Sequence, residues 1–468
     1  MRHTKIVATI GPASRDPEVL VRMIEAGMDV ARLNFSHGTD EEHAETAQLI
    51  RDAANRAGRP VAIMQDLPGP KLRIGPLSEI VELRPGDMVT FACGQEGTPG
   101  TASRMTVAWP GLAEAVNPGD VIFLADGLLR LRVKETRHGD NEIDAMVEIG
   151  GPVVSRQGLN VPGEVAKLPS VSEVDLDHLK TGERIGVDMV AVSFVRKADD
   201  VTMLRDHTRL PLIAKIEKPQ GVERAEEILR ASDCVMVARG DLGIEMPIEE
   251  VPMVQKKLLS LSGALTRPSI TATQMLVSMV SSSRPTRAEV TDVANAIIDG
   301  SDAVMLSQES AVGQYPVESI AMMASIAQQV ERELPYREWN EFRVRRDQRD
   351  PAYTLAYTAC RAAHELGLAA LICPTLSGRS ARLLSAHRPT APILALSPGI
   401  ETVRRCSLMW GVRAASLPRH ETTEGLIAAA ADRVVELGWL KRGDRVGITA
   451  GLPSGQPKTT SLLQIQVV

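Results

Sequence analysis

The sequence predicts an α/β protein in three parts: a (β/α)8 barrel, a small all-β domain inserted into it, and a C-terminal α/β domain. Apolar runs of strand length alternate with helical stretches along residues 1–68 and 165–336, which is typical of a parallel sheet buried on both faces. Eight such runs occur, the number that a (β/α)8 barrel needs. The pattern then changes over residues 69–164 and again over residues 337–468, which predicts the other two domains.

The carboxyl ends of the expected barrel strands carry unusually many polar residues. The runs cover residues 5–11, 29–36, 61–67, 188–194, 212–217, 234–241, 269–274 and 303–307. In a barrel of this kind the chemistry lies on the loops that follow the strands. The polar residues at these ends are Arg32, Asn34, Ser36, Asp66, Lys215, Glu217, Asp241, Thr273 and Ser307. Strands with a purely structural role would not need them, so we expect the active site at this rim.

Residues 69–164 interrupt the barrel between its third and fourth strands. Short strand-like segments alternate there with turn signals such as Pro-Gly and Asn-Pro-Gly-Asp, which predicts a small all-β domain. The insertion leaves the barrel at the catalytic rim. We therefore expect it to act as a lid that excludes water during the reaction.

The barrel pattern ends at about residue 336, where a polar, charged connector begins. Five apolar runs follow, with helical segments between them. The same alternation rule predicts a second α/β domain. The runs cover residues 368–375, 391–398, 411–418, 444–451 and 462–468.

Composition excludes several classes of function. The 468 residues include 53 Lys and Arg against 59 Asp and Glu, a net charge of −6, whereas a dedicated nucleic-acid-binding protein normally has a basic face. No apolar run approaches the ~20 residues of a membrane span, and the N-terminus does not resemble a signal peptide. The five cysteines are scattered without a C-x-x-C pair, which favours reduced thiols in a cytoplasmic protein.

The fifth and sixth expected strands supply the residues that most strongly indicate chemistry. Strand alternation places Lys215 and Glu217 on one face, and Asp241 ends the neighbouring strand. Two carboxylates without a soft ligand suit Mg²⁺ or Mn²⁺, with substrate oxygens completing the coordination. A metal with a lysine and an arginine is how proteins stabilise a phosphoryl group in transfer. The alternative is a buried Lys–Glu ion pair that braces the barrel.

Other rim residues allow two interpretations. Arg32, Asn34 and Ser36 share an alternating face of the second strand, where Arg32 suits a phosphate and the neutral oxygens suit a monovalent cation or a nucleotide phosphate. The alternative is a hydrogen-bonded barrel interior. Gly240 permits close backbone approach to a ligand. Thr273, taken alone, is an ordinary cap for a helix over residues 273–279.

These residues lie in motifs that together resemble the pyruvate kinase family. Seven motifs occur in order, and the likeness continues through SGRSARLLSAHRPTAPILAL (377–396) and ITAGLPSG (448–455) to the last domain. The seven are TKIVATIGPAS (4–14), ARLNFSHG (31–38), DLPGPKLR (66–73), KIEKPQGV (215–222), MVARGDLGIEMP (236–247), ATQML (272–276) and RPTRAEVTDVANAIIDG (284–300). The family fold is a barrel with an inserted lid and a C-terminal α/β domain, as the alternation of segments also predicts.

The resemblance implies an activity and partners. It implies transfer of the phosphoryl group of phosphoenolpyruvate to ADP, giving pyruvate and ATP, which is the last step of glycolysis. It also implies a cytoplasmic homotetramer. No nucleic acid or membrane partner is expected.

The resemblance also implies a role for each matching residue. Glu217 and Asp241 would hold the divalent metal, while Lys215 and Arg32 would hold the phosphoryl group from two sides. Thr273 and the backbone of Gly240 and Asp241 would seat the substrate carboxylate, with Thr273 near the face where enolpyruvate is protonated. The other implied positions are Ser307 for substrate, Asn34, Ser36, His37 and Arg73 for the nucleotide phosphates, and Asp126 on the lid.

The sequence departs from the family pattern at the monovalent-cation site, for which the resemblance implies Asn34, Ser36, Asp66 and the residue after it. Family members that require K⁺ have Thr-Lys-Gly-Pro-Glu after the aspartate, whereas this chain has Leu67 to Lys71. Leu67 keeps a backbone carbonyl but loses the hydroxyl. Lys71 replaces an acid with a tethered ammonium, a compact charge that can take the place of K⁺. We therefore expect an enzyme that does not require K⁺; the alternative is that Lys71 points to solvent.

Two further departures concern the lid and the eighth strand. The lid lysine of the family is Gln157 here, and Arg156 precedes it. We expect Arg156 to reach the nucleotide in its place, although adjacent strand residues face opposite ways. The family segment Ser-Gly-Glu-Thr-Ala-Lys-Gly is SQESAVG (307–313) here, so Ser307 is kept while its surroundings change.

The C-terminal domain contains one further candidate site. Residues 375–380, TLSGRS, follow an expected strand and open a helix, and such a turn offers N–H groups to an anion. The segment resembles the effector pocket that regulated family members use for a sugar phosphate or nucleotide. A capped strand-to-helix turn is the alternative. The residues concerned are Thr375, Ser377, Gly378, Arg379 and Ser380.

Two other functions compete with phosphoryl transfer. A class II aldolase-type lyase also places Glu and Asp at adjacent strand ends with an arginine, but it has neither the insertion nor the C-terminal domain. A catalytically silent barrel kept for binding is the other alternative. The intact set of Lys215, Glu217, Asp241, Arg32 and Thr273 argues against it.

Overall fold

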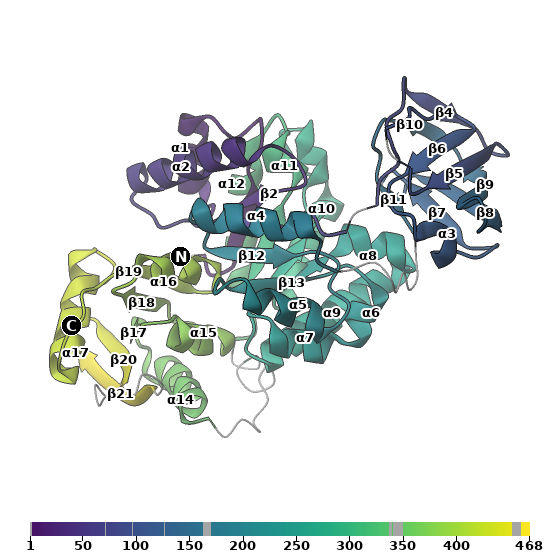
Figure 1. Cartoon of the computed structure of the whole chain (residues 1–468). Coiled ribbons are helices and arrows are strands. Elements are labelled where there is room, and N and C mark those ends of the chain that lie inside the picture. Colours follow the sequence, from purple (N-terminus) through teal and green to yellow (C-terminus); the bar gives the residue numbers. More distant parts are fainter. Residues whose placement is uncertain are drawn as a thin grey trace.

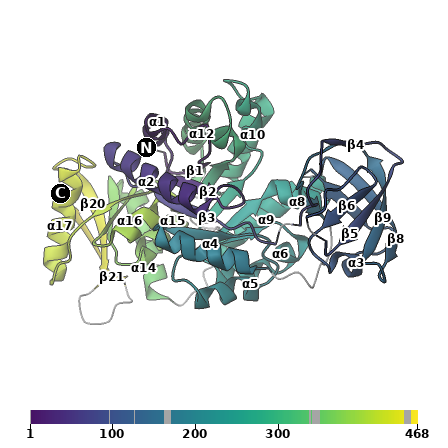
Figure 2. The same cartoon turned by 45° about the horizontal axis from the view of Figure 1, so that its top comes forward.

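The computed structural model shows three units in a row, with the barrel between the inserted β domain and the C-terminal unit (Figure 1). A view turned by 45° keeps the same order (Figure 2). The structure describes residues 2–70, 72–95, 97–125, 127–161, 170–336, 339, 350–451 and 460–468. Lys71 and Asp126 lie outside these residues.

Eight parallel strands close the barrel, which confirms the predicted fold class. Their order around the barrel is β1-β16-β15-β14-β13-β12-β3-β2. All eight are the expected apolar runs, and their strand residues are almost all buried. The bounds are β1 (Lys5–Thr9), β2 (Val30–Asn34), β3 (Ala62–Asp66), β12 (Met189–Val192), β13 (Leu212–Ile216), β14 (Cys234–Ala238), β15 (Ser269–Ala272) and β16 (Ala303–Leu306).

The outer ring of the barrel consists of helices whose starts the sequence specifies locally. Asp16 caps the first helix, and Thr39, Ser172 and Thr286 each form a capping box with an acid three residues on, satisfying N–H groups that a helix start leaves open. The helices are α1 (Pro17–Ala26), α2 (Asp40–Arg56), α4 (Glu173–Arg184), α5 (Ala198–Thr202), α6 (Pro219–Glu223), α7 (Ala225–Ala231), α8 (Arg239–Glu245), α9 (Val251–Ala264), α10 (Arg287–Ile298), α11 (Gln308–Ala311) and α12 (Pro316–Glu331). Short 3-10 helices cover Met203–Asp206, Ile248–Glu250 and Val277–Val280.

Strand alternation separates two apolar layers in the barrel. One set of strand residues packs outward against the helices. The other set fills the interior and includes Val7, Val30, Met64, Ala191 and Ile213. Since side chains repeat with a period of two, the residue two places after each of these also points inward, at the carboxyl end of its strand.

The inserted domain contains a six-stranded sheet in the order β11-β7-β8-β9-β5-β6 and a two-stranded sheet of β10 and β4. It has its own core, which includes Phe91 and Leu131. It meets the barrel at α8, where Asn160 lies next to Glu245. The elements are β4 (Val81–Leu83), β5 (Met88–Cys93), β6 (Arg104–Val107), α3 (Leu112–Ala115), β7 (Val121–Leu124), β8 (Leu129–Arg137), β9 (Glu142–Ile149), β10 (Gly151–Val153) and β11 (Leu159–Asn160).

The C-terminal unit is a five-stranded sheet in the order β19-β18-β17-β20-β21, in which only β21 runs antiparallel to its neighbour. Helices cover both faces of this sheet. The elements are α14 (Pro351–Leu366), β17 (Ala370–Pro374), α15 (Arg379–Ala386), β18 (Ile393–Ser397), α16 (Ile400–Arg405), a 3-10 helix (Cys406–Leu408), β19 (Val412–Ser416), α17 (Thr423–Glu436), β20 (Arg445–Gly451) and β21 (Thr460–Val467). The domain limits expected from the sequence stay a prediction.

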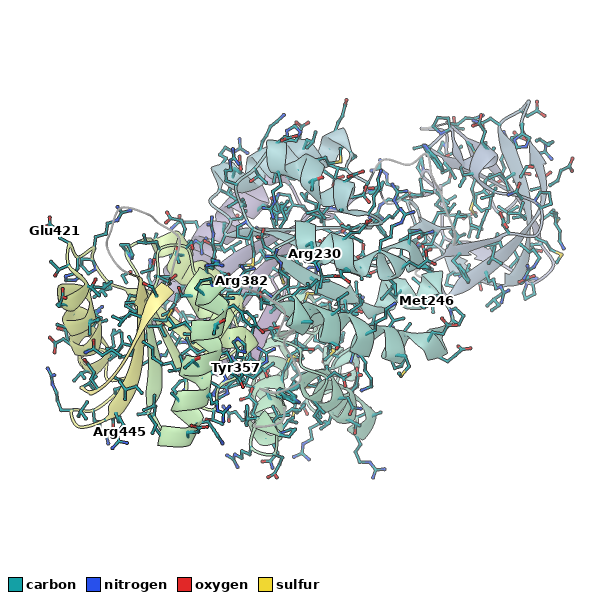
Figure 3. The ribbon with its side chains drawn as sticks, turned by 90° about the horizontal axis from the view of Figure 1, so that it is seen from below. Arg230, Met246, Tyr357, Arg382, Glu421 and Arg445 are labelled. Carbon is teal, nitrogen blue, oxygen red and sulfur yellow. The ribbon has the colours of Figure 1, made fainter. Side chains whose placement is uncertain are left out.

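The C-terminal unit docks against the barrel through a buried arginine. Arg388 donates from Nη1 to Asp302 Oδ1 at 2.7 Å and from Nη2 to the Gly300 carbonyl at 2.9 Å. Its guanidinium lies 4.7 Å from the ring centre of Trp410. Figure 3 labels two further arginines where these two units meet, Arg382 of α15 and Arg230 of α7.

A second contact ties the first barrel strand to the C-terminal unit. Lys5, fully enclosed at the start of β1, donates from Nζ to the Val412 carbonyl at 2.6 Å. Burial lowers the pKa of Lys5, while the charge of Asp29 acts in the opposite direction. All five cysteines are free and buried. Within the described ranges, no helix is both long and apolar enough to cross a membrane.

Replacing Asp302 by asparagine should weaken the junction strongly. Arg388 would keep its charge in a buried site without a carboxylate, which costs about 3–5 kcal/mol. The midpoint of urea unfolding should fall accordingly. Asp432→Asn is the matched control, because its ion pair with Arg442 is exposed and is worth less than about 1 kcal/mol. Equal midpoints for the two variants would contradict the importance of the Arg388 contact.

Candidate active site at the carboxyl ends of the barrel strands

Inward-facing polar side chains follow the apolar interior of the barrel and meet at its carboxyl end. Each stands two residues after an interior apolar residue, so strand alternation brings it to the same enclosed rim. These side chains are Thr9, Arg32, Asp66, Ser193 and Lys215.

Asp66 is the centre of this cluster. Its Oδ2 accepts a hydrogen bond from Arg32 Nε at 2.6 Å, and its Oδ1 lies 3.1 Å from Lys215 Nζ. The carboxylate is 1% exposed. Burial opposes its ionised form, but the charges of Lys215 and Arg32 hold the pKa of Asp66 below its ordinary value. Asp66 is therefore an anion that holds two cations at the rim.

Lys215 has three partners around its ammonium group. Besides Asp66, its Nζ lies 3.0 Å from Glu217 Oε1 and donates to Ser193 Oγ at 2.6 Å. Burial acts to lower the pKa of Lys215, but the carboxylates of Asp66 and Glu217 outweigh it and raise that pKa. Lys215 is thus a permanent cation. The predicted common face of Lys215 and Glu217 is confirmed by this contact.

Arg32 keeps part of its guanidinium available. Nε is used by Asp66, and Nη1 donates to Thr9 Oγ1 at 2.9 Å. Among the described residues, Nη2 has no partner. Because a guanidinium presents its donors in a planar fork, this remaining edge can bind an anion such as a phosphate.

The carboxylates of Glu217 and Asp241 fit a hard divalent cation. Glu217 is fully buried, and its Oε2 accepts a hydrogen bond from the Phe194 amide at 2.6 Å. Burial raises the pKa of Glu217 to about 7, with Lys215 acting against the rise and Asp241 adding to it. A cation between the two carboxylates would favour the ionised form of Glu217. In the part of the chain that the structure describes, no cluster of three or more His, Cys, Asp or Glu could hold a metal.

Thr273 and Gly240 meet at the adjacent strand ends. Thr273 Oγ1 accepts from the Gly240 amide at 2.7 Å and donates to the Ala272 carbonyl at 2.6 Å. A Cβ on Gly240 would lie 3.3 Å from this hydroxyl oxygen.

The helix expected over residues 273–279 is wrong. Thr273 and Gln274 have φ of +67° and +54°, so they form a left-handed turn. Only Val277–Val280 is helical, as a 3-10 helix.

The described residues that are expected to bind the nucleotide or a monovalent cation lie at the ends of β2 and β3, in the turn after β2, or in the inserted domain. Asn34 ends β2, but Ser36 lies beyond the strand in a turn, where its amide donates to Asn34 Oδ1 at 3.2 Å. The expectation that Ser36 shares the strand face is therefore wrong. The amide of His37 donates to the Asn34 carbonyl at 3.3 Å. The Leu67 carbonyl already accepts a hydrogen bond from Ser193 Oγ at 2.7 Å.

Arg73 and Arg156 lie together in the inserted domain. Arg73 Nη1 donates to the Arg156 carbonyl at 3.2 Å. Arg156 occupies an exposed turn with φ of +59°, so the strand rule for adjacent side chains does not apply to it. Ser307 follows β16, and its amide donates to Glu309 Oε2 at 2.8 Å.

The candidate effector turn lies at the far end of the molecule, in the C-terminal unit. The Gly378 amide donates to Thr375 Oγ1 at 3.0 Å, and Gly378 has φ of +80°. Arg379 opens α15 and forms an ion pair with Asp350, the cap of α14. Ser377 is exposed, and Ser380 is partly buried.

Sequence reasoning predicted Glu217 beside Lys215 but missed its other two partners, Asp66 and Ser193. Ser193 ends an expected strand and follows the interior residue Ala191 by two, so its inward direction was available as a signal. The pairing of Asp66 with Arg32 and Lys215 was not, since the three residues come from β3, β2 and β13.

Two family models match this chain: "Pyruvate kinase, barrel domain" over residues 1–320 and "Pyruvate kinase, alpha/beta domain" over residues 353–466. The chain is similar along all of its length to pyruvate kinases of several bacteria. It is 43% identical to that of Geobacillus stearothermophilus, covering 80% of that protein, and 40% identical to that of Staphylococcus aureus (strain MRSA252), covering 81%. It is 38% identical to that of Clostridium acetobutylicum, covering 100%.

Replacing Asp66 by asparagine should disable the site. Arg32 and Lys215 would lose the charge between them, and misplacement of such groups costs on the order of 100-fold in rate. Turnover and unfolding should both be measured. Asp177→Asn, which removes only an exposed ion pair with Lys180, is the control. Turnover of the Asp66 variant equal to that of the control would contradict this assignment.

Proposed function

The chain belongs to the pyruvate kinase family and is a phosphotransferase, and from this premise we propose how its residues transfer the phosphoryl group of phosphoenolpyruvate to ADP. The products are pyruvate and ATP. The observation that carries the proposal is the buried cluster of Arg32, Asp66 and Lys215, which presents two fixed cations at the rim. The family assignment replaces the lyase alternative.

Arg32 and Lys215 bind the phosphoryl group in this proposal. The free edge of the Arg32 guanidinium grips the phosphate, and the Lys215 ammonium neutralises charge during transfer. Asp66 and Ser193 hold Lys215 in place, so the cation needs no reorganisation at the moment of reaction. Glu217 and Asp241 are the residues that would hold the divalent metal, Mg²⁺ or Mn²⁺, which when bound supplies positive charge to the transferring phosphate.

The turn after β15 seats the organic part of the substrate. The Thr273 hydroxyl and the backbone at Gly240 and Asp241 bind the carboxylate of phosphoenolpyruvate, and Ser307 lies at the next strand end. Thr273 is also near the face on which enolpyruvate takes up its proton. The left-handed backbone of this turn brings the hydroxyl to the Gly240 amide.

The nucleotide lies between the loop after β2 and the inserted domain. Asn34, Ser36 and His37 bind its phosphates from the barrel, and Arg73 and Arg156 reach it from the insertion. The contact between Asn160 and Glu245 places the insertion next to the metal-binding helix α8. This position supports its role as a lid that excludes water.

Lys71 takes the place of K⁺ in this enzyme, in a region that also comprises Asn34, Ser36, Asp66 and Leu67. Support comes from the sequence, which has a lysine where K⁺-requiring relatives have an acid, and from the Leu67 carbonyl, which Ser193 already partly satisfies. The enzyme acts as a homotetramer in the cytoplasm, as the resemblance implies.

The activity and the K⁺ independence can be measured together. Pyruvate formation from phosphoenolpyruvate, ADP and Mg²⁺ should proceed with K⁺ replaced by a bulky organic cation, and adding K⁺ should change the rate by less than about twofold, because the Lys71 ammonium supplies the charge. Lys71→Glu restores the acid of K⁺-requiring relatives and should create a K⁺ requirement.

Two results would contradict these proposals separately. Strong K⁺ stimulation of the unaltered enzyme would remove the role of Lys71 and leave the transfer reaction. No turnover even with K⁺ would remove the transfer reaction and favour the silent barrel.

The turn at residues 375–380 binds a sugar-phosphate or nucleotide effector in this proposal. A panel of sugar phosphates and nucleoside monophosphates should shift the phosphoenolpyruvate saturation curve of the unaltered enzyme, and Arg379→Ala should abolish the shift. Asp350→Asn keeps an effective cap on α14 and leaves Arg379 charged, so it should retain activation. An unchanged response in the Arg379 variant would contradict this pocket.

A further inference from the structure

The turn that carries Thr273 has a backbone that its own residues do not favour. Thr273 and Gln274 both have left-handed φ, at +67° and +54°. A residue with a Cβ pays roughly 1–2 kcal/mol for this conformation. Such a turn persists only when surrounding groups hold it.

Arg239, at the end of the neighbouring strand, supplies these contacts. Its Nη2 donates to the Thr273 carbonyl at 2.8 Å and lies 3.4 Å from the Gln274 carbonyl. Its Nε donates to the Ala272 carbonyl at 3.4 Å. One guanidinium therefore contacts three successive carbonyls, which a single ammonium group cannot do with the same planar geometry.

Side chains of the outer helices α9 and α10 hold the Arg239 guanidinium in place. Nη1 donates to Asp292 Oδ1 of α10 at 2.7 Å and approaches Gln255 Oε1 of α9 at 3.4 Å. The Arg239 side chain is only 11% exposed. Its position is thus set by two outer helices, and the turn is held relative to them.

We propose that Arg239 is a positioning residue that holds the Thr273 hydroxyl in its working orientation. The hydroxyl bonds to Gly240 and Ala272 at 2.7 and 2.6 Å depend on the direction of the turn's backbone. Relaxation of the turn to right-handed φ would move the hydroxyl away from the Gly240 amide. The inference rests on the proposed role of Thr273 at the carboxylate and at the protonated face of enolpyruvate.

Proton exchange isolates this role from phosphoryl transfer. In D₂O the enzyme should replace methyl hydrogens of pyruvate by deuterium: a C–H bond breaks, its proton passes to solvent, and a deuteron from solvent forms the new C–D bond. Arg239→Lys should lower this exchange rate and kcat by at least about tenfold, because a catalytic group displaced by about an ångström loses most of its effect. The KM for ADP should not change.

A double-mutant comparison separates positioning from general stability. If Arg239 acts through Thr273, Arg239→Lys should add less than about a twofold further loss of exchange in a Thr273→Ala background, because contacting residues are not additive. Asp292→Asn weakens the anchor of Arg239 but keeps the guanidinium that contacts the turn, so it should give a smaller loss in the same direction. This variant keeps the inference testable if Arg239→Lys folds poorly.

Arg267→Lys is the matched control. Arg267 also donates to two backbone carbonyls, those of Leu229 and Arg230 at 3.1 and 3.2 Å, but at the amino end of β15. It should keep the unaltered exchange rate.

Four outcomes are distinguishable. A folded Arg239→Lys enzyme with unaltered exchange, or an equal loss in both backgrounds, would overturn the inference. Unaltered exchange in Thr273→Ala would instead remove the role of Thr273. Absence of pyruvate formation by the unaltered enzyme would remove the proposed function itself.

Discussion

The arrangement at the rim depends on one buried carboxylate. Asp66 lies between Arg32 and Lys215 and is 1% exposed. Each of these cations would be costly to bury alone, and together they would repel each other. Their shared anion permits two positive groups to stand at an enclosed end of the barrel, where charge acts more strongly than in water. In the proposed reaction, the substrate phosphate would meet cations that are already in place.

The ion pairs that brace the barrel would also hold Lys215 in place for the proposed phosphoryl transfer, so the two interpretations of Lys215 and Glu217 do not exclude each other. Lys215 contacts Asp66 and Glu217 at about equal distance, and Ser193 fixes it from a third side. Burial raises the pKa of Glu217, and the nearby charge of Asp241 adds to the rise while Lys215 opposes it. A divalent cation shared with Asp241 would offset the repulsion between the two carboxylates.

The first strand, β1, runs from the contact with the C-terminal unit to the candidate site at the opposite end of the barrel. At its start, Lys5 donates to a carbonyl of the C-terminal unit, and at its end the hydroxyl of Thr9 accepts a hydrogen bond from Arg32. The strand has five residues, or about 17 Å at ~3.3 Å per residue. The C-terminal unit therefore packs on the amino ends of the strands, and the inserted domain and the site occupy the carboxyl ends.

The sequence by itself determined the eight barrel strands, the inserted β domain and the common face of Lys215 and Glu217, because each follows from a local period of hydrophobic residues. Its motifs also determined the family. Only the tertiary structure decided that Asp66 pairs with Arg32 and Lys215, that Ser36 leaves its strand, and that Thr273 sits in a left-handed turn rather than at a helix cap. The contacts of Asp66 join residues from strands far apart in the chain, and the closure and stagger of the barrel, which no local pattern encodes, decide which side chains meet. The two turns depend on the neighbouring groups that hold their backbone, which the hydrophobic pattern does not encode either.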